Sequence, residues 1–169
     1  MASRCELPAE SRLRSSLPRL DYVDSYSVPS RISGRSMVEI HAALLGHLPP
    51  AFKVLLLMRS ALVRPFGIRS VSYGELAASI DTDRKFVQGD KIGRWIIFSQ
   101  DEDELITGAD DRHLDFRVSV MRQRGTRVVL STAVMTHNAV GRGYLSLILP
   151  FHRYGVAKLV SNASAAGRI

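Results

Sequence analysis

The sequence predicts an α+β fold in which a curved antiparallel sheet wraps around a long C-terminal helix. In residues 110–138, apolar and polar side chains alternate along two stretches separated by a glycine, as in a long β-hairpin. From residue 141 onward, apolar side chains recur at three-to-four spacing, which is typical of a helix. A sheet that is apolar on one face must cover that face, and the last helix is the obvious cover.

The first strand is predicted at residues 21–28, where side chains alternate up to Pro29. Residues 1–19 contain prolines, serines and arginines, and we expect them to form a flexible N-terminal arm. Residues 20–165 are expected to form a single domain, since 169 residues with 46% hydrophobic content suffice for one core.

Two short helices are predicted between the first and the second strand. Ser36 and Glu39 have the spacing of a capping box, which marks the start of a helix that must end before Pro49. Residues 51–63 are apolar nearly all round and predict a second, buried helix. The charged segment 81–93, which contains two glycines, is expected to be a loop.

Four further strands are expected, at 94–100, at 104–108 and in the two arms of the long hairpin. A three-residue loop at Gln123-Arg124-Gly125 would pair Val120 with Val128 and make one face almost wholly apolar. A two-residue turn would shift the pairing by one residue and break that face, so we favour the first register. In the favoured register, with the three-residue loop, Asp111 lies opposite His137.

Composition limits the classes of function. The net charge of +7 comes from arginines scattered along the chain, with few aromatic residues among them, which argues against nucleic-acid binding. No apolar run reaches the roughly 18 residues of a membrane span. The N-terminus lacks the apolar segment of a secretory signal, and with a single cysteine we expect a cytoplasmic protein.

No metal or cofactor site is expected from the motifs. Cys5 stands alone, which excludes an internal disulfide and a cysteine-based metal centre. His41 and His47 are six residues apart on a predicted helix, so they point to different faces and do not form a ligand pair. Phosphate-binding and nucleophile-elbow motifs do not occur in the sequence.

Several longer motifs carry a family resemblance, namely DYVDSY, GADDRHLDFRVSV, VMTHN, GRGYL and PFHR. Over roughly residues 7–159 the chain resembles the bacterial family known as domain of unknown function 2867. That family is similar in build to the Bet v 1/START/polyketide-cyclase (SRPBCC) superfamily, whose helix-grip fold encloses an apolar ligand cavity. The resemblance therefore implies a fold and a cavity, and it implies no reaction.

The expected function is the binding of a small hydrophobic or amphipathic molecule between the sheet and the C-terminal helix. An alternative is an enzyme of the cyclase, hydratase or isomerase kind that uses polar groups in the same cavity. A third is an interaction protein that forms a homodimer through an exposed sheet edge. The residues expected to line the cavity are Met58, Trp95, Phe98, Phe116, His137, Tyr144 and His152.

One polar column of the predicted hairpin has two interpretations. It comprises Asp111, His113, Asp115, Arg117 and His137. The column forms either a site in which a carboxylate orients His137 as a general base, or a set of cross-strand ion pairs on a solvated face. The solvated face is favoured, because the apolar face would turn toward the cavity.

The start and middle of the last helix also carry polar candidates. Asn138 is expected to cap the helix, and Gly141 and Gly143 to allow a tight strand-to-helix corner. Pro150 should kink or divide the helix. His152 either lines the cavity as a proton donor or bonds to a backbone carbonyl freed by Pro150, and we favour the second role.

Overall fold

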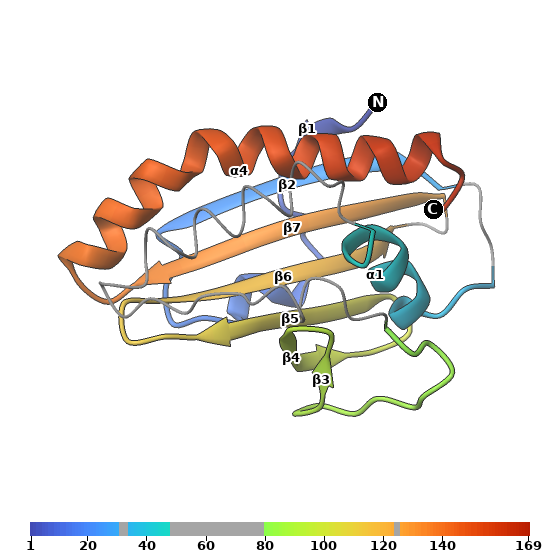
Figure 1. Cartoon of the computed structure of the whole chain (residues 1–169), viewed down its shortest axis with the longest axis horizontal. Coiled ribbons are helices and arrows are strands. Elements are labelled where there is room, and N and C mark those ends of the chain that lie inside the picture. The colour runs from blue at the N-terminus through green and yellow to red at the C-terminus, as the bar shows by residue number, and fades with distance from the viewer. Residues whose placement is uncertain (31–33, 48–79, 124–125) are drawn as a thin grey trace.

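The computed structural model describes residues 1–30, 34–47, 80–123 and 126–169. Its centre is an open, curved antiparallel sheet with the strand order β1-β2-β7-β6-β5-β4-β3 (Figure 1). The strands are β1 Ser3–Cys5, β2 Tyr22–Pro29, β3 Lys91–Ile92, β4 Trp95–Gln100, β5 Glu104–Asp110, β6 Leu114–Gln123 and β7 Arg127–Thr136. The helices are the 3₁₀ turn η1 Arg12–Ser15, α1 Met37–Leu45 and α4 Ala139–Ala165. The predicted fold class, an antiparallel sheet with a long C-terminal helix, is confirmed.

Helix α1 starts where the sequence predicts. The Ser36 hydroxyl accepts the backbone N–H of Glu39 at 3.2 Å, and the Glu39 carboxylate accepts the backbone N–H of Ser36 at 2.7 Å. This is the predicted capping box, which satisfies two N–H groups that the helix itself leaves without acceptors. The second predicted helix, at residues 51–63, lies outside the described residues, and so does Met58.

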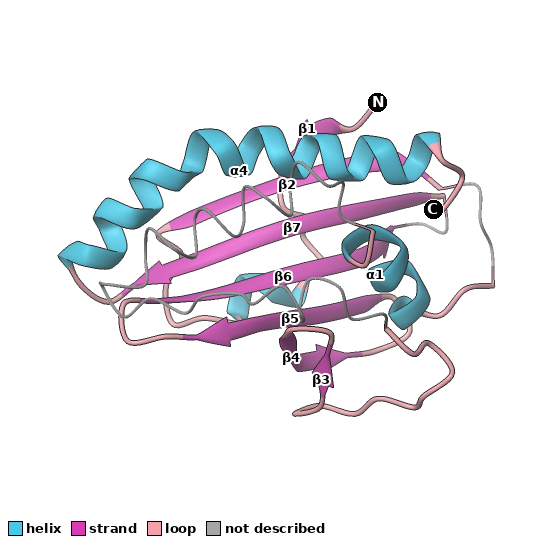
Figure 2. Ribbon diagram, viewed as in Figure 1, coloured by secondary structure: helices cyan, strands magenta, loops and turns pink. Residues whose placement is uncertain are grey.

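Helix α4 begins at its predicted cap and runs as one piece along β2 and β7 (Figure 2). Asn138 Oδ1 accepts the backbone N–H of Gly141 at 3.1 Å. The helix passes so close to the hairpin that a Cβ on Gly141 would lie 2.0 Å from the His113 carbonyl oxygen, which only glycine avoids. Pro150 lies inside the helix and does not divide it.

The hairpin keeps the predicted faces but not the predicted partners. Gln123 pairs with Arg127, so the connection begins one residue later than expected, and Val120 faces Leu130 instead of Val128. The pairing is thus shifted by two residues, which leaves every side chain on its expected face because strands have a period of two. The prediction that Asp111 lies opposite His137 is wrong.

Both faces of the sheet carry a hydrophobic core. The side that α4 and α1 cover contains Tyr26, Val28, Ile97, Leu105, Val118, Val120, Val128 and Leu130, packed against apolar residues of the two helices. The reverse side contains Ile106, Ala133 and Met135, packed against Leu13 and Leu17. The sheet is therefore the middle layer of the fold.

Residues 1–19, expected as a flexible arm, form the cover of the reverse side. Strand β1 pairs with β2, and η1 places Leu13 against the sheet with no exposed surface. In Figure 1 this N-terminal segment passes behind the sheet, on the side away from α4. Buried leucines give this segment a place in the core, and its flexibility stays a prediction.

The two edge strands are short and were not predicted. β1 and β3 have three and two residues, too few to show an alternating pattern. β3 lies inside the stretch 81–93 that was expected to be a loop. In the part of the chain that the structure describes, no helix is long and apolar enough to cross a membrane.

Candidate functional site

The helix-facing side of the sheet forms a floor whose rows follow from the strand register. Asp24 pairs with Thr132, Thr132 with Val118, and Val118 with Thr107. These four residues make one transverse row across β2, β7, β6 and β5. In the next row Tyr22 pairs with Val134, Val134 with Phe116, and Phe116 with Ala109. We call these two rows the floor.

A polar cluster stands at the β2 end of the floor, beneath α4. The Asp24 side chain is fully buried, accepts the Tyr22 hydroxyl at 2.7 Å and lies 3.4 Å from His152 Nε2. His152 thus faces a carboxylate. The sequence favoured a backbone carbonyl freed by Pro150 as its partner, and the partner in the structure differs from that expectation. Burial raises the pKa of Tyr22 to about 12, so its hydroxyl stays protonated as a donor to Asp24. Arg153 Nε also donates to the Tyr22 hydroxyl, at 3.3 Å.

A second cluster stands at the β5 end of the floor, beneath α1. His41 is 1% exposed, and its Nε2 lies 3.2 Å from Thr107 Oγ1. The imidazole meets the Trp95 ring edge to face at 6.0 Å, and Trp95 meets Phe116 in the same way at 5.8 Å. Within the described chain, His41 Nδ1 is a buried nitrogen without a hydrogen-bond partner.

The electrostatics of His41 follow from this burial. Burial, together with the nearby positive charge of Arg94, lowers the pKa of His41 to about 3. The imidazole is therefore neutral near pH 7, with one nitrogen a donor and the other an acceptor. Thr107 is three strands from Asp24 along the row, which places the two clusters about 14 Å apart at the usual strand spacing.

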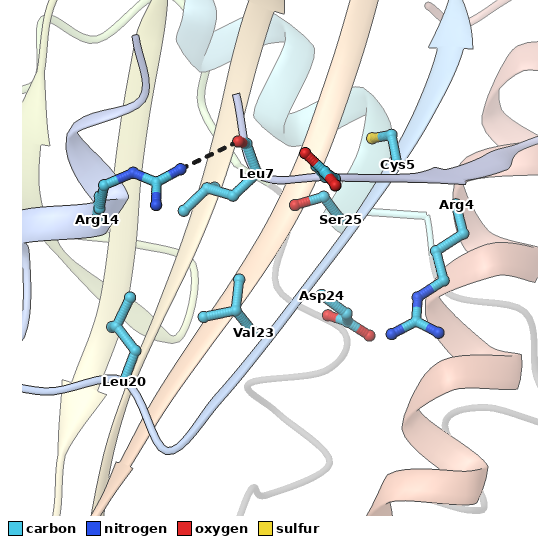
Figure 3. Close-up of a pocket in the computed structure, with 9 residues that line it drawn as sticks. Arg4, Cys5, Leu7, Arg14, Leu20, Val23, Asp24 and Ser25 are labelled. Atoms are coloured by element: carbon cyan, nitrogen blue, oxygen red, sulfur yellow. Dashed lines mark hydrogen bonds between the residues drawn. The ribbon is translucent and has the colours of Figure 1, made fainter. Parts of the chain in front are cut away.

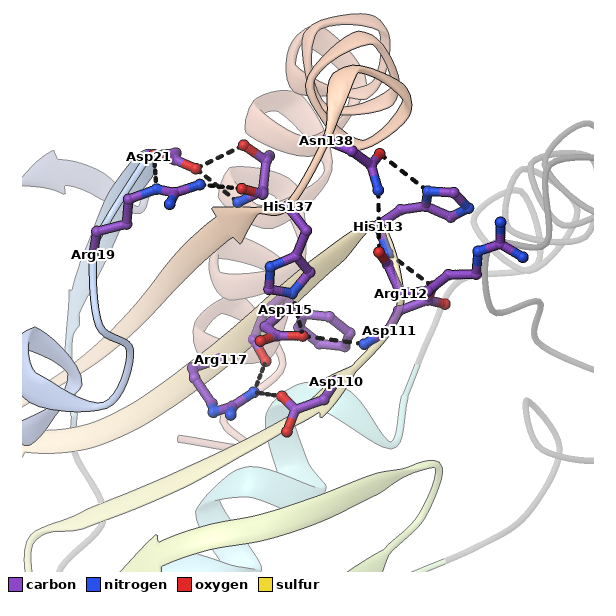
Figure 4. Close-up of polar contacts among 12 residues, drawn as sticks. Arg19, Asp21, Asp110, Asp111, Arg112, His113, Asp115, Arg117, His137 and Asn138 are labelled. Atoms are coloured by element: carbon purple, nitrogen blue, oxygen red, sulfur yellow. Dashed lines mark hydrogen bonds and ion pairs between the residues drawn. The ribbon is translucent and has the colours of Figure 1, made fainter.

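Part of the polar column of the hairpin lies on the reverse side (Figure 4), where Arg117 is buried, Asp115 is half-buried and His137 is exposed. The His113 ring lies apart from these three residues, with its Nδ1 3.1 Å from Asn138 Oδ1. Arg117 is 5% exposed, stacks on Phe98 at 3.4 Å from the ring centroid, and donates from Nη1 to Asp110 at 2.5 Å. His137 Nε2 lies 3.0 Å from Asp115 Oδ1. The expected solvated face is corrected: the ion pairs exist, but the N-terminal segment and Phe98 cover much of that side.

The same side holds two carboxylates with structural roles. Glu104, 2% exposed, accepts the hydroxyls of Ser11 and Ser119 at 2.5 Å each and the Arg12 backbone N–H at 2.8 Å, which ties η1 to the sheet. Asp21 accepts from Arg19 and from both the N–H and the hydroxyl of Thr136. These hydrogen bonds, with that from Arg19 foremost, lower the pKa of Asp21.

A groove of about 640 Å³ opens at the edge of the sheet where β1 ends (Figure 3). It is lined by Arg4, Cys5, Glu6, Leu7, Arg14, Leu20, Val23, Asp24 and Ser25. Arg14 donates to the Leu7 carbonyl at 3.3 Å. The Asp24 side chain has no exposed surface, so the groove does not reach its carboxylate.

The structure brings together only part of the predicted site. Trp95 and Phe116 are in contact on the helix-facing side, and His152 stands over the other end of the floor. Tyr144 lies in the first half of α4 and is half-buried. Phe98 and His137 lie on the reverse side, where Phe98 packs with the second core and His137 pairs with Asp115.

Two residues at the ends of the floor, one in the sheet and one in α1, were missed by sequence reasoning. Asp24 was taken only as part of a strand, and His41 was considered only as a metal ligand. A signal for His41 existed, because the helix residues around it that share its face are apolar, and a histidine among them is a buried polar group to be explained. Among the described residues, no three His, Cys, Asp or Glu side chains are grouped to hold a metal.

The fold and the floor define an α+β protein with an antiparallel sheet, apolar on its helix-facing side except for a few buried polar groups. A family model described as a protein of unknown function (DUF2867) matches residues 16–159, and the chain belongs to this family. No curated protein and no solved structure matches the chain.

Proposed function

We propose that the protein binds a small hydrophobic or amphipathic molecule between the floor and helix α4. The observation that carries the proposal is the make-up of the floor and of the residues beside it. Trp95 and Phe116 are half-buried aromatic residues in mutual contact, and polar groups gather at its two ends. Ligand sites are typically apolar surfaces with a few placed polar groups. The sequence resemblance implies a build of the Bet v 1/START/polyketide-cyclase kind, and with that build we propose the same function.

Native mass spectrometry of protein purified from its own host tests the proposal. A co-purifying small molecule is expected, and adding it to the stripped protein should raise the melting temperature. The single tryptophan, Trp95, belongs to the proposed site, so its emission should change on binding. Absence of a co-purifying molecule, with no thermal shift across a lipid and polyketide panel, would contradict the proposal.

The two phenylalanines provide a matched pair of variants. Phe116→Ala removes a ring from the floor, whereas Phe98→Ala removes one from the reverse side. Both should destabilise the protein, because each removes a packed aromatic side chain. The ligand-induced thermal shift should be lost or strongly reduced in Phe116→Ala and kept in Phe98→Ala.

An enzyme of the cyclase, hydratase or isomerase kind is the second candidate. It is favoured by one observation, the carboxylate of Asp24 set 3.4 Å from an imidazole nitrogen of His152 with the Tyr22 hydroxyl beside it. A carboxylate that orients a histidine is a common general acid–base arrangement. Incubating the panel with wild type and His152→Ala, and looking for products isomeric with a substrate or richer by one water, separates catalysis from binding.

The homodimer and the cytoplasmic location are further proposals. The short strands β1 and β3 protect the sheet edges against pairing with a second copy, so a dimer through these edges has little support. Light scattering across a concentration series would reveal such a dimer.

The proposed cytoplasmic location is supported by the lone cysteine, which is typical of proteins in a reducing compartment.

A further inference from the structure

We propose that His41 is a ligand-binding residue whose Nδ1 makes the hydrogen bond to an uncharged hydroxyl or carbonyl group of the bound molecule. This inference rests on the proposed function and specifies its chemistry. It assigns the β5 end of the floor to the polar group of the ligand. The apolar body would then lie over Phe116 and its neighbours, between the two polar clusters.

The first argument is the missing partner. His41 is held by α1 against the sheet, and Thr107 engages its Nε2 at 3.2 Å. In the described part of the chain its Nδ1 is buried and has no hydrogen-bond partner. Nearly all buried polar side-chain atoms in proteins have one, so such an atom points to a group that is absent from the isolated chain.

The second argument is the setting of the imidazole. Trp95 meets the ring of His41, and Phe116 meets Trp95 in turn, so the nitrogen lies in the aromatic part of the floor. An apolar side chain of similar size would avoid a buried unsatisfied nitrogen at this place. A histidine here costs stability in the free protein, and binding a hydrogen-bonding group would recover that loss.

The third argument concerns the kind of group that fits. The buried imidazole stays neutral near pH 7, since its pKa is lowered to about 3. Burying an ion beside a neutral ring is unfavourable, whereas an uncharged group needs only one hydrogen bond. A hydroxyl both donates and accepts, and so it suits either tautomer of His41. A carbonyl suits the tautomer that carries the proton on Nδ1.

A pair of probe molecules tests the hydrogen bond. Naphthalene and 2-naphthol differ by one hydroxyl, and their binding can be followed through the emission of Trp95. Wild type should bind 2-naphthol about tenfold more tightly than naphthalene, which is the ratio expected for one hydrogen bond. His41→Leu should bind the two probes with equal affinity. His47→Leu, which removes an exposed histidine near the end of α1, should behave as wild type.

The outcomes separate this inference from the proposed function. If wild type binds both probes equally, the site exists but His41 does not provide the contact. If His41→Leu still prefers 2-naphthol, another residue makes the hydrogen bond and the inference is overturned. If neither probe binds to wild type, both the inference and the proposed function lose their support.

Melting temperatures show whether a loss of binding in His41→Leu arises merely because the variant is less stable. A merely structural histidine would be hydrogen-bonded on both sides, and its replacement by leucine would lower the melting temperature. A ligand-binding His41 predicts that ligand-free His41→Leu melts at the same temperature as wild type or higher. A lower melting temperature together with equal loss of affinity for both probes would contradict the assignment.

Discussion

Asp24 lies at one end of a row of the floor, and His41 of α1 contacts Thr107 at the other end; both side chains are buried, and they differ in how their polar atoms are satisfied. The Asp24 carboxylate has the Tyr22 hydroxyl and the His152 imidazole beside it. His41 has Thr107 on one nitrogen and no partner, among the described residues, on the other. Charge on His41 would be uncompensated, so acid should destabilise the folded state through His41.

We therefore expect His41 to make the folded state acid-labile. The folded state keeps His41 neutral down to about pH 3, while the unfolded chain takes up a proton below about pH 6.5. The unfolded state thus binds more protons in this window, and stability falls as the pH falls, by about 1.4 kcal/mol per pH unit. Urea unfolding of wild type and His41→Leu from pH 7 to pH 4 measures the difference.

The free energy of unfolding should fall more gently with acid in His41→Leu. His47→Leu is the control. His47 is exposed, so replacing it does not relieve the cost of burying a charged imidazole. Parallel pH profiles for wild type and His41→Leu would mean that His41 is accessible to protons in the folded state. That result would also contradict the argument that the group bound by His41 is uncharged.

At the scale of elements, the corner between β7 and α4 depends on one glycine. A Cβ on Gly141 would lie 2.0 Å from the His113 carbonyl oxygen, whereas a Cβ on Gly143 would meet nothing within 4 Å. Gly141→Ala should cost about 1–3 kcal/mol, since backbone must move to admit the methyl group. Gly143→Ala should instead stabilise by about 0.5–1 kcal/mol, because alanine favours the helix. Chemical denaturation of both variants checks the opposite signs.

The predictable elements are those with long periodic patterns or caps. The hairpin faces followed from alternation, and α1 and α4 followed from Ser36 and Asn138 as caps. The hairpin partners did not follow, because a shift of two residues keeps every side chain on the same face and the apolar pattern cannot distinguish the two pairings. The alternation also placed Trp95 and Phe116 on the helix-facing side, whereas the contacts of His152 could not be predicted because they depend on how α4 lies on the sheet.

The N-terminal segment shows what pattern reasoning misses. Leu13 and Leu17 are separated by three polar residues, and Pro18 follows Leu17, so the apolar pattern is too short to establish a strand or helix period. Their burial depends on a tertiary partner, the reverse side of the sheet, and on Glu104, which lies some 90 positions away in the sequence. That side was expected to be solvated because only one cover, the last helix, was evident from the sequence.

Leu13 tests whether this segment belongs to the folded core. Leu13 is fully buried, so Leu13→Ala should destabilise the protein by about 2–5 kcal/mol. Arg14→Ala, at the adjacent exposed position, should stay within about 0.5 kcal/mol of wild type. Equal stability of the two variants in urea would indicate that the segment is a loosely held arm.

On the scale of the whole molecule, one sheet supports two cores that share its backbone hydrogen bonds. The helix-facing core includes Val118, Val120 and Leu130, and the reverse core includes Ile106 and Ala133. These residues alternate along the same strands, β5, β6 and β7. Loss of either cover would expose one face of strands whose other face is still packed, and this arrangement favours cooperative unfolding.

Two tryptophan probes can test that cooperativity. Trp95 reports the helix-facing side in wild type, since it packs with His41 and Phe116. In a Trp95→Phe, Phe98→Trp double variant the only tryptophan would report the reverse side, where it can keep the stacking with Arg117. Within each protein, the melting curve from tryptophan emission should coincide with that from circular dichroism, because both faces unfold in one step.

If the two melting curves of one protein do not coincide, the order of the transitions shows which layer of the fold unfolds first. If the reverse-side probe changed first while the circular dichroism of the sheet persisted, the N-terminal segment would be a separate unit released before the core. Adding Leu13→Ala to that variant should then advance only the early step. If the segment belongs to the core, as the burial of Leu13 and its Glu104 anchor require, Leu13→Ala should move both curves together to lower temperature.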